Sequence, residues 1–141
     1  MKVTAMRISQ LICLSALILA AAPGFAASRV VEGDEAQHLY DAQKASALVL
    51  VQKDTTFHLR KPGAAEEDKP QSMTIKAGEL FFITNEEAAY VHNVYDETDS
   101  SWVLKKQTPS TVAALAFDSP GEHHLRCAIH PKMQITVIVT R

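Results

Sequence analysis

Apolar and polar residues alternate along much of this chain with the two-residue period of β-strands. The clearest case is the stretch 133–140, where Met133, Ile135, Val137 and Val139 share one face and polar residues such as Gln134 lie between them. Further short apolar or alternating segments lie at 45–52, at 72–85 on either side of Gly78, at 111–117 and at 122–127. Polar segments rich in proline and glycine separate them, notably 60–71 and 118–121. Several short strands joined by turns predict an all-β protein, an antiparallel sandwich or barrel.

A different period occupies the segment before the first of these strands. Ala36, Leu39 and Tyr40 recur at helical spacing, but Gln43, the next position on that face, is polar. Asp34 is of a residue type that caps helices. We therefore predict a short helix or a loosely ordered arm over residues 27–46, ahead of a β domain at 47–141.

The first 26 residues have the order of a secretory signal peptide. Lys2 and Arg7 precede an apolar run at 11–22, and small residues then allow cleavage after Ala26. The alternative is an uncleaved anchor, but a membrane-spanning helix needs roughly 20 apolar residues. We predict that residues 1–26 are removed, and that the mature chain is periplasmic or secreted and not inserted in the membrane.

Removal of this segment changes both the charge and the cysteine content. It leaves 12 Lys and Arg against 16 Asp and Glu, a formal net charge of −4, and one cysteine, Cys127. The sequence has no cluster of basic residues of the kind that indicates nucleic-acid binding. Exported domains normally pair their cysteines, so a lone thiol is either buried and inert, reactive, or bonded to a metal.

Cys127 begins a run of potential soft-metal ligands. His130 and Met133 follow it with two residues between each pair, and His92 lies 35 positions upstream at the end of a strand-like segment. A β-sandwich can bring these four residues to one rim. One thiolate, two imidazoles and a thioether are typical of a blue copper site, in which two histidines and a cysteine bind strongly and methionine weakly. Structural zinc prefers four strong ligands, and calcium and magnesium require oxygen.

Three segments resemble the small blue copper proteins, the cupredoxins, of the amicyanin and plastocyanin type. They are the ligand loop CAIHPKM at 127–133, the HNV motif at 92–94, and MTIKAGELFFITN at 73–85. The resemblance implies an eight-stranded Greek-key sandwich with one copper ion per chain, cycling between Cu(I) and Cu(II). It implies that His92, Cys127 and His130 are the equatorial ligands and that Met133 is the axial ligand.

The same resemblance implies roles for residues around the ligands. Asn93 is expected to tie the two ligand segments together, with its backbone amide near the Cys127 sulfur. His130 is expected to reach the surface, where Ile129, Pro131 and Ala128 surround it and a redox partner docks transiently on a monomer. Two positions depart from the family pattern, Val91 and His123, and the region 96–110 matches nothing in it.

These observations favour an electron carrier that exchanges single electrons with redox partner proteins. The alternative is a copper-binding or copper-trafficking protein without physiological electron transfer. A cysteine-nucleophile enzyme is disfavoured, because nothing in the sequence suggests an oxyanion site. Outside the motifs, we expect His123 in the core or at its rim, Trp102 in packing, and the following residues in solvent: His38, His58, His124 and the acidic run 66–68.

Overall fold

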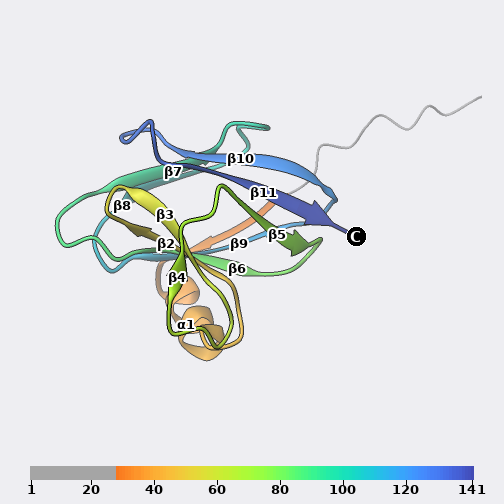
Figure 1. Cartoon of the computed structure of the whole chain (residues 1–141), viewed down its shortest axis with the longest axis horizontal. Coiled ribbons are helices and arrows are strands. Elements are labelled where there is room, and N and C mark those ends of the chain that lie inside the picture. The colour runs from red at the N-terminus through yellow and green to blue at the C-terminus, as the bar shows by residue number, and fades with distance from the viewer. Residues whose placement is uncertain (1–27) are drawn as a thin grey trace, which may run out of the picture.

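The computed structural model describes residues 28–141, so the predicted signal peptide lies outside the described residues. These residues form eleven strands and one helix (Figure 1). In chain order they are β1 (Ser28–Glu32), α1 (Gly33–Gln43), β2 (Val49–Lys53), β3 (Thr56–Arg60), β4 (Glu67–Asp68), β5 (Ser72–Lys76), β6 (Phe81–Asn85), β7 (His92–Asp96), β8 (Val103–Gln107), β9 (Val112–Phe117), β10 (Gly121–Cys127) and β11 (Gln134–Thr140).

Two sheets pack face to face, which confirms the predicted β-sandwich. The first has the strand order β1-β9-β6-β2-β3-β4, and the second has the order β5-β11-β10-β7-β8. Two of the pairs are parallel, β2 with β6 and β5 with β11, so the expectation of a wholly antiparallel sandwich was wrong. Parallel neighbours need a long crossover connection, and strand-by-strand patterning does not reveal such connections.

The main core lies between the two sheets and takes one face of each strand. On β11 the alternation predicted from sequence is confirmed, because Ile135, Val137 and Val139 are buried. On β10 the interior positions are His123, Leu125 and Cys127, while His124 is exposed. The strand therefore directs the Cys127 side chain inward, as the sequence predicted.

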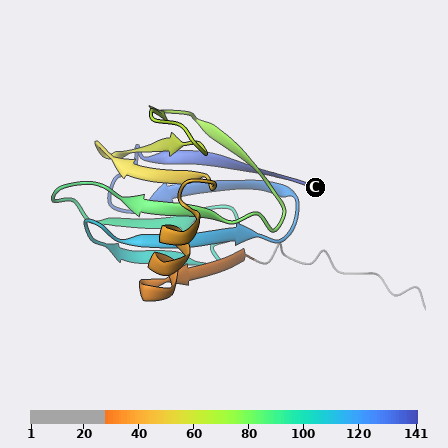
Figure 2. The same ribbon diagram turned by 90° about the horizontal axis from the view of Figure 1, so that it is seen from below.

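Helix α1 covers the outer face of the first sheet (Figure 2). A second apolar cluster lies there, formed by Val49, Val51, Phe82 and Ala114 with side chains of the helix segment packed against it. The ring of Tyr40 meets that of Phe82 edge to face at 5.3 Å between centroids. Strands β2 and β6 are therefore buried on both faces, which explains why their segments 49–51 and 81–83 are continuously apolar rather than alternating.

The helix begins one residue earlier than its predicted cap. Glu32 occupies the N-cap position and Gly33, with φ of +71°, turns the chain from β1 into the helix. Asp34 lies in the first turn, where its negative charge interacts favourably with the helix dipole although it is not the N-cap residue. Within residues 28–141, no helix combines the length and apolar character needed to cross a membrane.

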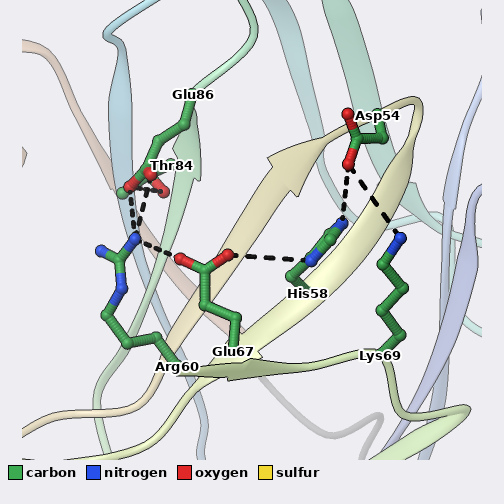
Figure 3. Close-up of polar contacts among 7 residues, drawn as sticks. All are labelled: Asp54, His58, Arg60, Glu67, Lys69, Thr84 and Glu86. Atoms are coloured by element: carbon green, nitrogen blue, oxygen red, sulfur yellow. Dashed lines mark hydrogen bonds and ion pairs between the residues drawn. The ribbon is translucent and has the colours of Figure 1, made fainter. Parts of the chain in front are cut away.

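Two residues expected in solvent, His58 and Glu67, are instead largely buried, and the β3–β4 hairpin explains both. His58 is only 5% exposed, with Nδ1 3.7 Å from Glu67 Oε2 and Nε2 3.8 Å from Asp54 Oδ2 (Figure 3). Glu67 belongs to the short strand β4, which folds back on β3, and its carboxylate also pairs with Arg60. The remaining surface expectations hold, because His38, Glu66 and Asp68 are exposed.

Candidate metal centre

The segment from Cys127 to Met133 forms a tight loop between β10 and β11. The Met133 N–H donates to the His130 carbonyl at 2.8 Å, and the Cys127 N–H donates to the Met133 carbonyl at 3.1 Å. These two bonds close the seven-residue segment on itself. They fix the backbone of all three predicted ligands of this loop relative to one another.

His92 reaches the same place from the other predicted motif, because it begins β7, the strand beside β10. Val94 is the register partner of Cys127, and the Ala128 N–H donates to the Asn93 carbonyl at 2.9 Å. Strand pairing therefore brings together two segments that lie 35 residues apart in sequence.

Three ligand atoms face one another at this junction. Cys127 Sγ lies 3.7 Å from Nδ1 of His92 and 3.7 Å from Nδ1 of His130, and the two nitrogens are 3.1 Å apart. A point equidistant from the corners of this triangle is about 2.0 Å from each, close to the 2.0–2.3 Å of metal–nitrogen and metal–sulfur bonds in proteins. The cluster therefore fits a single transition-metal ion without rearrangement.

Burial of the cluster is uneven. His92 is fully buried and Cys127 is 2% exposed, whereas His130 is half-buried. Met133 is fully buried in the same apolar cluster as Cys127. One imidazole thus forms the boundary between the enclosed cluster and solvent.

An apolar surface surrounds His130. Ile129 is 48% exposed, and Ala128 and Pro131 are also exposed. Tyr90, which is 54% exposed, meets the His130 ring edge to face at 5.8 Å. Tyr90 was not predicted from the sequence, although its position two residues before the predicted ligand His92 indicated that it lies near the site.

His92 has a distinctive environment on its far side. Its Nε2 is buried without a hydrogen-bond partner and lies 4.0 Å from Glu87 Oε1. Burial lowers the pKa of His92, as does the neighbouring His130, while Glu87 opposes the shift. Burial and His130 thus favour the neutral ring, which is the form that binds metals. Glu87 was also missed, because its carboxylate is placed by a contact with the distant Thr55 N–H at 2.6 Å.

Asn93 on β7 links this strand to β8 and to the loop that follows β10. Its carbonyl accepts from Ala128, and its side-chain oxygen accepts from the Lys106 N–H at 2.8 Å. Lys106 has φ of +53° at an irregularity in the pairing of β7 with β8, so this bond satisfies an amide that the strand ladder leaves free. The predicted approach of the Asn93 amide to the Cys127 sulfur stays a prediction.

His123, the departure from the family pattern on β10, is a core residue as predicted. Its Nδ1 lies 2.6 Å from Asp96 Oδ2, and its ring stacks on Phe117 at 3.8 Å. Both members of the pair are buried. Because the carboxylate partners the ring, His123 is accounted for as a structural residue.

This two-sheet architecture is the cupredoxin fold, which the sequence resemblance implied. Solved structures that share it include amicyanins. The amicyanin of Paracoccus versutus (Thiobacillus versutus) is 25% identical, with a TM-score of 0.52 over 68% of this chain and 83% of that chain. A Cu(I) form and an oxidised form of two amicyanin variants are 19% and 20% identical, and both have a TM-score of 0.56 over 79% of this chain and 98% of theirs.

Sequence comparisons add nothing to this likeness. No protein-family profile matches the chain, and no curated protein matches it significantly. The eight strands implied by the resemblance become eleven in the described residues, among them the two-residue β4 and the N-terminal β1.

Proposed function

We propose that this chain is an exported blue copper protein that carries single electrons between redox partners. The observation that carries the proposal is the triangle of Cys127 Sγ and the Nδ1 atoms of His92 and His130, whose size fits one metal ion. Met133, buried beside the cysteine at the end of the same loop, completes the ligand set as its weak axial member.

The donor chemistry selects copper. Thiolate and thioether sulfur favour Cu(I), and imidazole also suits Cu(II), so bound copper can supply one-electron chemistry in this site. The protein's own residues contribute the surroundings. Two backbone hydrogen bonds hold the loop from Cys127 to Met133 in shape. The buried side chains of His92 and Met133 exclude water from the site. The same donors then serve both oxidation states with little rearrangement.

Electrons enter and leave through His130 in this proposal. Its ring is half-buried, and exposed apolar side chains surround it: Tyr90, Ala128, Ile129 and Pro131. We call these four side chains the His130 patch. A small apolar patch suits weak, short-lived docking of a redox partner onto a monomer. The burial of the other three ligands, His92, Cys127 and Met133, would slow the release of copper, which favours electron transfer over copper trafficking.

The first experiment is a visible and electron-paramagnetic spectrum of the mature protein after addition of Cu(II), with Cys127→Ser as the comparison. We expect an intense blue thiolate-to-copper band with narrow hyperfine splitting, bleached reversibly by a reductant and absent from the variant. A pale Cu(II) spectrum that the substitution leaves unchanged would refute the proposed site.

A second experiment tests the His130 patch as the route of the electrons. Ile129→Asp places a charge in the His130 patch, and we expect the electron self-exchange rate to fall by roughly tenfold because two copies then repel at their contact. Ile138→Asp, an isoleucine of similar exposure (39% against 48%) at the far end of the β10–β11 pair, is the matched control. Line broadening in mixtures of the Cu(I) and Cu(II) proteins gives the rate. Equal rates in both variants would argue against this patch as the route.

A further inference from the structure

A layer of buried polar side chains lies between the sheets behind His92. Gln52, Asn85 and Gln107 are 0%, 0% and 4% exposed. Elsewhere the interior positions of these strands are apolar, such as Leu50 on β2 and Leu104 on β8. Three uncharged polar residues at one end of an apolar core need an explanation, because each costs free energy unless its polar atoms are satisfied.

The register of the strands places this layer against the predicted ligand. Gln107 on β8 lies directly opposite His92 on β7, so their side chains share one face of the second sheet. Gln52 lies opposite Asn85 in the first sheet. The Asn85 amide then bridges the two sheets, donating to the carbonyls of Gln107 at 2.7 Å and Tyr90 at 2.8 Å.

The members of the layer differ in how well they are satisfied. Asn85 donates twice, and its oxygen accepts from the Glu87 N–H at 3.0 Å. Both amide atoms of Gln52 and of Gln107 are buried without a hydrogen-bond partner, and so is Nε2 of His92. Leaving a buried donor or acceptor unsatisfied costs about 1–3 kcal/mol, and leucine at either glutamine position would avoid this cost. One such glutamine opposite His92 in the strand register, and a second in the same layer, indicate a function for the buried amide next to the unpaired imidazole N–H.

That function is to accept the second N–H of the His92 imidazole. A histidine that binds a metal through one nitrogen almost always donates its other N–H to an acceptor, which fixes the tautomer and raises the basicity of the ligand. His92 faces the cluster with Nδ1, so its Nε2 carries the proton. Neither Glu87 nor Gln107 bonds to Nε2 in the structure. Glu87 Oε1 lies at 4.0 Å and already accepts from the Thr55 N–H, whereas the Gln107 amide oxygen has no competing partner.

We propose that Gln107 is the positioning residue of His92 in the copper-loaded protein, with its amide oxygen accepting the Nε2–H. This inference rests on the proposed copper site and adds to it the group that sets the strength of one ligand. Copper bound at Nδ1 would polarise the ring, and the amide acceptor would stabilise that polarised form without adding a charge to the interior.

The test compares Gln107→Leu with the parent protein. We expect the affinity for Cu(II) to fall 10–100-fold, the usual effect of removing an outer hydrogen bond from a metal ligand. We also expect the Nε2 proton of His92 in the Cu(I) protein to exchange faster with solvent and to shift in nitrogen-detected NMR spectra. The free energy of unfolding of the metal-free variant stays equal or rises, because leucine has a similar volume and no unsatisfied atoms.

Three further variants make the result specific. Gln52→Leu is expected to shift the same proton less, and Glu87→Gln to leave its solvent exchange unchanged. Gln71→Leu, on the surface, is the matched control and changes nothing. If the parent binds copper with the blue band while Gln107→Leu keeps the same affinity and proton exchange, the role of Gln107 is wrong and the copper site stands. If the parent shows no blue band, the proposed function fails and takes this inference with it.

Discussion

Cys127 ends β10 with its sulfur directed into the sandwich, at the place where the loop to β11 and the start of β7 converge. The thiol is therefore buried, yet it faces two imidazole nitrogens rather than apolar side chains alone. An inert core cysteine has no need of such neighbours. At the scale of single residues, this arrangement distinguishes a ligand from a small hydrophobic residue.

Met133 is the residue whose proposed role is easiest to separate from packing. Met133→Leu conserves the volume of a fully buried side chain, so we expect a loss of less than about 1.5 kcal/mol in the free energy of unfolding. The blue band should persist, since the cysteine and both histidines remain. The reduction potential should change, because the weak axial sulfur is lost. Voltammetry of both proteins checks this, and an unaltered potential would assign Met133 to the core alone.

At the scale of secondary-structure elements, the β3–β4 hairpin shows a polar network unrelated to the metal centre. Arg60 Nη2 bonds to Glu86 at 2.9 Å and to Glu67, so one guanidinium neutralises two carboxylates (Figure 3). Hydrogen bonds to Glu86, and then to Glu67, raise the pKa of Arg60 above its usual range. The network joins β3 to β4 and to the end of β6.

Removing the arginine should therefore weaken this edge of the sheet. Arg60→Met leaves the mostly buried Glu67 carboxylate near Glu86 without a counter-charge, and we expect a loss of about 1–3 kcal/mol in the free energy of unfolding. Lys61→Met is the matched control, because Lys61 and Asp68 pair with both side chains well exposed and such pairs contribute about 0–1 kcal/mol. Urea denaturation measures both. Equal losses would mean that the network adds nothing beyond an ordinary surface pair.

At the scale of the whole molecule, the metal centre lies where β7, β10 and the β10–β11 loop meet, so metal binding and folding are linked. A ligand that binds only the folded state adds about 2.7 kcal/mol of stability at a free concentration 100 times its dissociation constant. We expect copper to raise the melting temperature by several degrees. Scanning calorimetry with and without copper tests this, and Cys127→Ser should lose most of the increase. A parent protein insensitive to copper would contradict the linkage.

The sequence predicted the parts of the molecule that depend on local pattern. Cys127, His130 and Met133 lie within one short loop, so their spacing is visible in the sequence. In β11 the alternating apolar residues are those that the structure buries. The fold class and the approach of His92 to this loop were also predictable, through motifs that resemble a known family. The failures share a cause in long-range pairing. His58 looked like a surface residue because nothing near it in sequence shows that β4 covers it, and Glu87 and Gln107 gain their significance only from strands that meet at His92.

The enclosure of Cys127 also makes the protein report on its own opening. It is the only cysteine in the part of the chain that the structure describes, and at 2% exposure a thiol-directed dye reaches it only when the surrounding strands separate. In the metal-free protein, the labelling rate at high dye concentration therefore approaches the rate at which β7 and the loop detach from each other. A single colour-producing reagent would thus measure the local opening rate of this end of the sandwich, with no engineered probe.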